Sequence, residues 1–369
     1  MAGRMLKALL ITSNIVSMMT IPDLLGRAGF KVDCVSLTRA KKHRHVVNNF
    51  IYVADVAELL EVASRKARER YDLIVIGEDE LLQTVLNSSL SDDLKLLLLP
   101  VLETEKFCHI YSKIGLSNVL QEYGVNTPEF RVANGRDDLK KLVGEIGYPV
   151  IVKIDSSSSG FGVYECSDNN DVDNLSGELK DYPVLIQKKI EGTQLDLSGF
   201  YQDGQLIHFS YSCPQRFFGN KFGVESVRNY SQLGSVEEIF FDDLMHLGMA
   251  LGANGFANIC CIRSVQDQKL YFIEADMRPN AWINFPRYFG DDPAIRISNY
   301  FTSGQVLKYP CKVNKRFPEK ITLPFFFRLN LWEIISNRYG VWKYIPERNT
   351  IARYLIFKKV RELVSSILR

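Results

Sequence analysis

The chain has 369 residues, of which 46% are hydrophobic and 24% are charged, as in ordinary soluble globular proteins. A length of this order favours two or three domains over a single core. The formal net charge of +2 gives no electrostatic case for a nucleic-acid partner, and no apolar run reaches the roughly 20 residues of a membrane span. Seven cysteines without CxxC spacing indicate neither a zinc site nor a disulfide framework, which favours a reducing, cytoplasmic location.

The N-terminal part of the chain alternates short apolar runs with helical patterns. Residues 6–12 (LKALLIT) and 31–37 predict strands, residues 56–71 predict a helix, and residues 72–79 predict a buried strand. This βαβ rhythm favours a small parallel sheet with helices on its faces. Basic residues before the first apolar run also resemble a signal peptide, but polar residues at 12–14 interrupt the run and favour a buried strand.

The most informative stretch is PVIVKIDSSSSGFGVYE, residues 149–165. Two helices that end at glycines, over 109–124 and 136–147, are predicted before it, with a turn and a strand at 125–134 between them. An apolar strand then ends near Lys153 and a loop rich in serine and glycine follows. The backbone N–H groups of such a loop, beside a lysine, can bind phosphates. The candidate phosphate ligands are Lys153, Ser157, Ser158, Ser159, Gly160 and Gly162.

A second strand and a hairpin follow the loop. Residues 182–189 predict the strand, and residues 195–212 predict a hairpin that turns at Asp203-Gly204. The next stretch, 213–230, is predicted as a loop-like insertion. Its basic side chains are expected either to bind an anionic acceptor or to be solvated. They are Arg216, Lys221 and Arg228.

Two carboxylates end a second predicted hairpin. A helix is predicted over 236–252, and FANICCIRS (256–264) and KLYFIEAD (269–276) form the hairpin. Glu274 and Asp276 alternate on its last strand, so both point to one face. Two such carboxylates can hold a Mg²⁺ ion that bridges phosphate oxygens, although a solvated strand face is the alternative.

The C-terminal segment is basic and aromatic. Residues 308–369 hold fourteen Lys/Arg against four Asp/Glu, so this segment carries +10 and the rest of the chain −8. A basic amphipathic helix there is expected to cover a core, to bind an acidic partner, or to lie on an anionic membrane surface.

The order of these motifs resembles the ATP-grasp superfamily, which includes biotin carboxylase, D-alanine–D-alanine ligase and the large subunit of carbamoyl-phosphate synthetase. The resemblance covers about residues 1–305 and is strongest over 145–282, where YPVIVKIDSSSSGFGV is similar to the family's lysine-plus-loop lid and IEADMRPNAW to its metal-binding strand end. It implies an α/β and α+β ATP-grasp fold. The implied units are a Rossmann-like pre-ATP-grasp domain (1–105), a lid subdomain (106–190), a C-terminal antiparallel-sheet subdomain with the metal site (191–305) and a C-terminal extension (306–369).

The resemblance also assigns roles to individual residues. Lys113 resembles the lysine that reaches the α-phosphate, and Lys153 the lysine near the α/β-phosphates and adenine. Gln187 replaces the usual hinge glutamate, and Gln194 the usual acid on the ribose hydroxyls. The remaining matches are Lys188 and Ile190 for the hinge backbone, Glu274 and Asp276 for Mg²⁺ (with Mn²⁺ as an alternative ion), and Arg278 for the acyl phosphate or the substrate carboxylate.

One departure from the family pattern affects the metal site. Counting along FANICCIRS places Cys260 where the family has its other metal carboxylate, and a thiol is a poor ligand for Mg²⁺. Three explanations stay open: Glu274 and Asp276 carry all the metal, the register of the alignment is shifted, or the chemistry is weakened.

The function implied by the resemblance is ATP-dependent joining of a small-molecule carboxylate to an amine through an acyl phosphate, with release of ADP and phosphate. A thiol or carbamoyl-type acceptor is not separated from the amine by the sequence. The rival function is a catalytically weak, ATP-binding regulatory or scaffold protein whose tail docks on a partner or makes it peripheral to a membrane. The resemblance also leaves a homodimer open.

Overall fold

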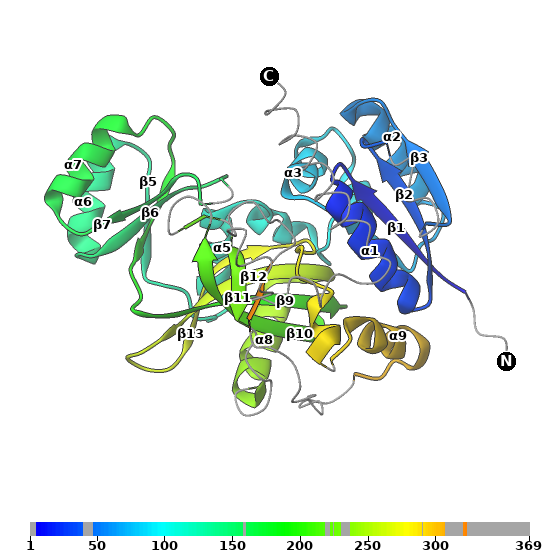
Figure 1. The fold of residues 1–369 in the computed structure, drawn as a ribbon. Helices are drawn as coiled ribbons and strands as arrows, with labels where there is room; N and C mark the ends of the chain where they lie inside the picture. The colour runs from blue at the N-terminus through cyan, green and yellow to red at the C-terminus, as the bar shows by residue number, and fades with distance from the viewer. Residues whose placement is uncertain are drawn as a thin grey trace, which may run out of the picture.

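The computed structural model describes residues 5–39, 47–157, 160–217, 222–223, 225–229, 237–289, 291–306 and 320–322. The fold is mixed α/β, with one parallel and two antiparallel sheets in this described part of the chain. Figure 1 shows them as three units: the parallel sheet on the right, a long central sheet, and a small sheet on the left that projects from the body. Apart from 320–322, the predicted tail lies outside the described residues.

The N-terminal unit has the predicted parallel sheet, in the order β3-β2-β1-β4. Its first strand is apolar almost throughout because both faces of the sheet are covered. Ala8 and Leu10 face helix α1, whereas Leu9 and Ile11 face α2. The strands are β1 (Leu6–Thr12), β2 (Phe30–Ser36), β3 (Asn49–Tyr52) and β4 (Leu73–Ile76), and the helices are α1 (Ile15–Arg27), α2 (Val56–Ala67), α3 (Asp79–Asn87) and α4 (Asp92–Leu98).

The small sheet forms a unit with its own core. Its strands are antiparallel, in the order β5-β8-β6-β7, and helices α6 and α7 pack on one face. The predicted strand before the serine-rich loop is confirmed as β6, which pairs antiparallel with β7 across the loop. The elements are the short helices η2 (Thr104–His109) and α5 (Lys113–Glu122), which lead into the unit, then β5 (Phe130–Ala133), α6 (Arg136–Ile146), β6 (Val150–Ile154), β7 (Val163–Cys166), α7 (Asn169–Glu178) and β8 (Val184–Lys188).

The central sheet has the order β13-β12-β9-β10-β11-β14. Both predicted hairpins are confirmed, and Asp203 and Gly204 have φ of 51° and 74°, as a tight hairpin turn requires. Helices α5 and α8 pack on one face and α9 on the other, together with the N-terminal sheet. The elements are β9 (Gly192–Gln202), β10 (Gln205–Phe217), β11 (Glu225–Asn229), α8 (Glu237–Leu251), β12 (Gly255–Ser264), β13 (Leu270–Asp276), η3 (Phe285–Phe289), α9 (Pro293–Ser303) and β14 (Lys320–Thr322).

The prediction of a loop-like insertion over 213–230 is wrong for most of its length. Strand β10 continues to Phe217 and β11 pairs with it in antiparallel register, with irregularities at Pro214 and Arg216. A bulge lets the sheet tolerate proline, which otherwise indicates a turn. Lys221 lies outside the described residues.

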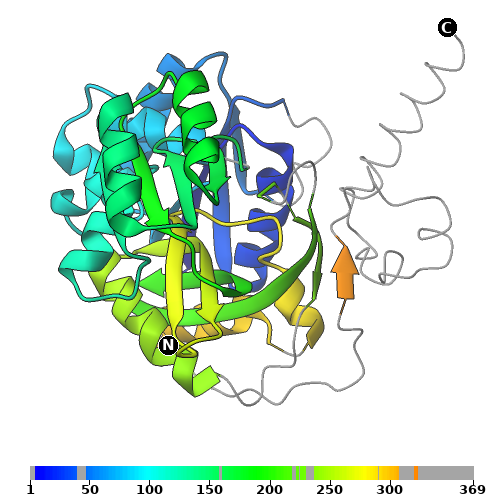
Figure 2. The same ribbon diagram turned by 90° about the vertical axis from the view of Figure 1, so that its left-hand side faces the viewer.

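The sixth strand comes from the C-terminal segment. β14 pairs antiparallel with β11, and Ile321 lies opposite Arg228. Figure 2 shows this short strand beside β11 at the edge of the sheet. Within the described part of the chain, each helix is too short or too polar to cross a lipid bilayer.

Candidate active site

A cavity of about 490 Å³ lies between the lid sheet (β5–β8) and the central sheet. The two sheets present their polar strand ends to it, so residues far apart in sequence meet there. Predicted residues that line it are Lys113, Lys153, Ser157, Gly160, Gln187, Lys188, Ile190, Gln194 and Glu274. Ser158 and Ser159 lie outside the described residues, and Gly162 lies outside the lining and packs against Ile154.

Two lysines from different elements, Lys113 of α5 and Lys153 of β6, line the cavity. Lys113 is the first residue of α5, and its Nζ donates to the Ser157 hydroxyl at 3.1 Å and to the Asp155 carbonyl at 3.1 Å. Lys153 is 7% exposed, and its Nζ donates to the Ile273 carbonyl at 3.3 Å. Burial lowers the pKa of Lys153 to about 8, although the negative charge of Glu274 opposes the shift. Both lysines are therefore placed to meet anionic oxygens.

The lid loop touches the far side of the cavity through Gly160. Its φ is +73°, and a Cβ there would lie 1.9 Å from the Phe222 carbonyl oxygen. A side chain at this position would separate the loop from the turn between β10 and β11.

The hinge residues use their side chains within the protein. Lys188 Nζ donates to the carbonyls of Gly147 and Tyr148 at 2.8 and 2.9 Å, and its backbone N–H donates to the Glu129 carbonyl at 2.8 Å. The use of the Lys188 backbone to bind a base stays a prediction. Gln194 Nε2 donates to Asp196 Oδ1 at 3.1 Å. Gln187 is 2% exposed and its Nε2 donates to Ser117 Oγ at 3.4 Å.

The two predicted metal carboxylates lie at the end of β13. Asp276 accepts hydrogen bonds from Asn258 Nδ2 at 2.9 Å and from Arg278 Nη2 at 3.0 Å. Burial, together with the charge of Asp276, raises the pKa of Glu274 to about 7. Cys260 lies directly opposite Glu274 in the β12–β13 pairing, which confirms that a thiol stands beside this carboxylate.

Glu274 and Asp276 supply only two carboxylates for a Mg²⁺ ion. Among the described residues, no group of three or more His, Cys, Asp or Glu side chains is arranged to hold a metal ion. Mg²⁺ is commonly bound by one or two carboxylates together with substrate phosphates. Glu274 and Asp276 therefore fit an ion that arrives with a nucleotide, and not a protein-only metal site.

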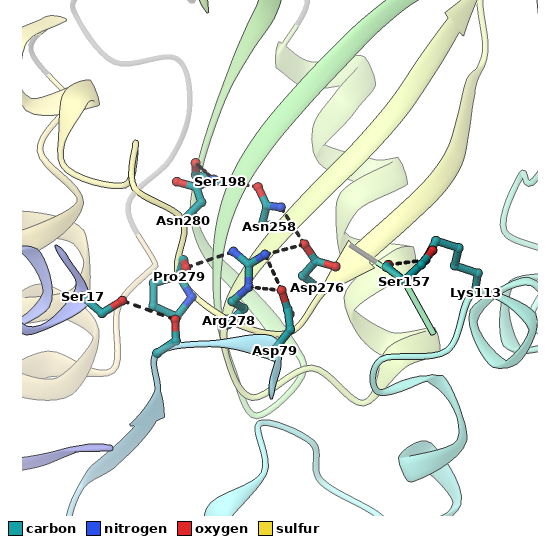
Figure 3. Close-up of polar contacts among 11 residues, drawn as sticks. Ser17, Asp79, Lys113, Ser157, Ser198, Asn258, Asp276, Arg278, Pro279 and Asn280 are labelled. Carbon is teal, nitrogen blue, oxygen red and sulfur yellow. Dashed lines mark hydrogen bonds and ion pairs between the residues drawn. The ribbon is translucent and has the colours of Figure 1, made fainter. Parts of the chain in front are cut away.

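Arg278 has partners that the sequence did not reveal. Its Nε donates to Asp79 Oδ2 at 2.6 Å, and its Nη2 also contacts Asp276 (Figure 3). Burial and the charge of Asp276 raise the pKa of Asp79 to about 6. This ion-pair network joins α3 of the N-terminal unit to the end of β13.

A second cavity of about 300 Å³ lies between the N-terminal unit and the end of β13. The start of α1, residues 77–80 and His109 line it, together with Asp276 and Arg278. Lys113, Ser157 and Glu274 line both cavities, so the two meet at these side chains.

The sequence reasoning missed Asp196, Ser198 and Asn258 as polar residues of the site, and it placed Arg228 in a loop-like insertion instead of on a strand. Arg228 lies 3.3 Å from Asp196 and stacks over the Trp282 ring at 4.6 Å. Asn280 Nδ2 donates to Ser198 Oγ at 2.7 Å and to Asn258 Oδ1 at 2.8 Å (Figure 3). The alternation of side chains along a strand was the signal that could have identified these residues. Positions 196 and 198 on β9 lie opposite 260 and 258 on β12, on the face of the sheet that carries the carboxylates.

Comparison with known proteins agrees with this geometry. Residues 118–196 match the family model of the ATP-grasp domain. A D-alanine–D-alanine ligase from Pseudothermotoga lettingae is 37% identical over 92 residues, 24% of this chain and 29% of the relative. The chain contains an ATP-grasp domain. The arginine-specific large chain of carbamoyl phosphate synthase from Neurospora crassa is 31% identical to this chain over 96 residues, 25% of the chain and 8% of the relative.

Solved structures show the same ATP-grasp fold. N5-carboxyaminoimidazole synthetase from Staphylococcus aureus, in complex with ADP, superposes with a TM-score of 0.68 at 14% identity and covers 90% of this chain and 86% of that one. The biotin carboxylase domain of 2-oxoglutarate carboxylase from Hydrogenobacter thermophilus gives 0.61 at 16% identity, covering 83% and 71%. The curated relatives are matched over less than a third of their length, so their whole activities do not transfer with the fold.

Proposed function

We propose that this ATP-grasp protein is an ATP-dependent ligase that joins a carboxylate to an amine. The observation that carries the proposal is the junction of two cavities at Lys113, Ser157 and Glu274. One cavity has the size and the lysines for a nucleotide, and the other would hold the substrates. The curated relatives and the ADP complexes among the structural neighbours support ATP as the nucleotide.

The reaction would proceed in two displacements. A carboxylate oxygen attacks the γ-phosphorus and ADP leaves, which gives an acyl phosphate; the amine nitrogen then attacks the acyl carbon, and phosphate leaves as the nitrogen loses a proton. Lys113 and Lys153 would neutralise charge on the phosphates and position them. The contact of Gly160 with the turn at Phe222 would close the cavity and exclude water from the acyl phosphate. Mg²⁺, or Mn²⁺ in its place, when bound through Glu274 and Asp276 would neutralise the same phosphate oxygens.

The charges of the second cavity favour an amine as the acceptor. Glu78, Asp79 and Glu80 line it together with Glu274 and Asp276, against the cations Lys113 and Arg278. Arg278 donates to two of these carboxylates, so it acts as a brace for the site more than as a ligand for a substrate carboxylate. An excess of negative charge attracts a protonated amine, whereas it gives a thiol or bicarbonate no advantage. One of these carboxylates would accept the proton that the nitrogen must lose before it attacks the acyl carbon.

The test is to trap the intermediate with hydroxylamine while screening carboxylates with ATP and Mg²⁺. An active carboxylate gives a hydroxamate and one ADP per product. Glu274→Gln should abolish this product, whereas Glu191→Gln, whose side chain is 70% exposed, should not change it. Hydroxamate formed equally well by Glu274→Gln would refute the proposed site.

A second candidate function is a regulatory or scaffold role with ATP bound but little turnover. The favouring observation is Cys260, which lies opposite Glu274 where the family is expected to have a carboxylate. Tight ATP binding that needs no Mg²⁺, with no hydroxamate from any carboxylate, would favour this function. A cytoplasmic location, a homodimer, and an acidic or membrane partner for the tail stay predictions.

A further inference from the structure

Gln187 presents a buried amide to the nucleotide cavity. It lies on β8, is 2% exposed, and lines the cavity beside apolar side chains. Its Nε2 donates to Ser117 Oγ at 3.4 Å. Among the described residues no group donates a hydrogen bond to its Oε1. The Oε1 atom is nevertheless not fully buried, because it is absent from the buried polar atoms without a partner in this part of the chain, so it is accessible from the cavity.

Ser117 determines which end of this amide faces the cavity. Its hydroxyl has a single proton, and that proton is donated to the Lys113 carbonyl one turn earlier in α5, at 2.9 Å. Ser117 Oγ can therefore accept a hydrogen bond from Gln187 but cannot donate one to it. The network turns the NH₂ group of Gln187 toward the helix and its carbonyl oxygen toward the cavity.

The surroundings of this carbonyl fit the edge of a purine. Apolar residues line the same cavity and can enclose a flat ring. A 6-aminopurine offers a donor to a carbonyl oxygen, whereas a 6-oxopurine offers an acceptor, and two acceptors facing each other in a buried site are unfavourable. The apolar residues of the lining include Pro128, Ile151, Ile190, Ile262 and Ile273.

We infer that Ser117 is a positioning residue that makes the nucleotide site select 6-aminopurine over 6-oxopurine triphosphates. The inference rests on the proposed nucleotide site and adds the group that sets its base preference. A carboxylate at position 187 would accept hydrogen bonds in either orientation. Because Gln187 carries both a donor and an acceptor, its selectivity depends on the neighbour that fixes it.

The reversed arrangement shows why Ser117 matters. If the Ser117 hydroxyl turned to donate to Gln187 Oε1, the NH₂ group would face the cavity and suit a 6-oxopurine. That arrangement gives up the 2.9 Å hydrogen bond to the Lys113 carbonyl for a longer contact at 3.4 Å. In Ser117→Ala both orientations lose their partner on the helix, so the amide is free to serve either base.

The experiment compares the binding of ATP and ITP by calorimetry, because these nucleotides differ at the 6-position of the base. In the wild type we expect ITP to bind about tenfold to a hundredfold more weakly than ATP. Ser117→Ala should reduce this ratio to about threefold or less, mainly by tightening ITP. Ser176→Ala is the matched control, since Ser176 is equally buried and donates to the Asp173 carbonyl in α7, away from the cavity.

The double variant Ser117→Ala with Gln187→Glu separates positioning from a merely structural role. A carboxylate accepts in any orientation, so the double variant should recover the preference for ATP. An unchanged ratio in Ser117→Ala, or a ratio that the double variant fails to restore, would overturn the inference. If the wild type binds ATP and ITP equally, the inference fails while the nucleotide site stands; if it binds neither, the proposed function fails as well.

Discussion

Replacing His109 by glutamine should make the free energy of unfolding depend less on pH between neutral and acid pH. His109 ends η2, is 1% exposed, and its Nε2 lies 3.0 Å from the Leu251 carbonyl oxygen. Burial, with a smaller contribution from the charge of Lys106, lowers its pKa to about 4 from an ordinary value of 6.5. The imidazole of His109 is therefore neutral in the folded state at pH values at which it is already protonated in the unfolded chain.

The sign and size of the effect follow from this difference. As the pH falls below 6.5, the unfolded state binds a proton that the folded state does not, so the free energy of unfolding decreases until the pH reaches about 4. A shift of this size corresponds to about 3 kcal/mol of stability that is present at neutral pH and lost at the acid end. Glutamine can keep the donor to the Leu251 carbonyl but does not titrate.

The assay is urea unfolding of the wild type and of His109→Gln at a series of pH values from about 7.5 down to about 4.5. The wild type should lose about 2 kcal/mol more than the variant over this range. His246→Gln, at an exposed position of α8, is the control and should match the wild type. An NMR titration that places the imidazole of His109 near its ordinary pKa would refute the reasoning, as would equal pH slopes.

Three further predictions concern the lid, the metal and the edge of the sheet. Gly160→Ala should weaken ATP binding by about tenfold, because the Cβ meets the Phe222 carbonyl and φ is positive; Gly144→Ala, with open space around it, should not. Cys260→Asp should increase the affinity of the ATP complex for Mn²⁺, measured by electron paramagnetic resonance, because it adds a carboxylate opposite Glu274. An unchanged affinity would exclude position 260 from the metal site. Ile321→Pro should speed amide exchange in β11 about fivefold, unless β14 contributes nothing to the sheet.

The parts of the fold that the sequence predicted are those with local signals. The strand at 6–12 is a continuous apolar run, and the turn at Asp203-Gly204 uses residues that tolerate a positive φ. β11 and β14 have no such signal, because each is short and their pairing joins positions 228 and 321. Only the tertiary structure brings these two segments together.

The candidate site divides in the same way. Lys153 and Glu274 stand at strand ends within recognisable motifs, and the structure places both at the nucleotide cavity. Arg278 was expected on a substrate, but its partner Asp79 lies 199 residues earlier in the chain, beyond the reach of spacing arguments. Ser117 is an ordinary helix serine in the sequence, and its contact with Gln187 exists only after α5 packs beneath β8.

The edge strand β14 has a consequence for synthesis of the protein. Its partner β11 ends at Asn229, about ninety residues before β14 is made. At translation rates of about 5 to 20 residues per second, β11 stays an unpaired edge for several seconds or longer after it emerges. During that interval its free N–H and C=O groups can recruit another strand, so a nascent chain stalled before residue 320 should be more prone to aggregate than the finished one.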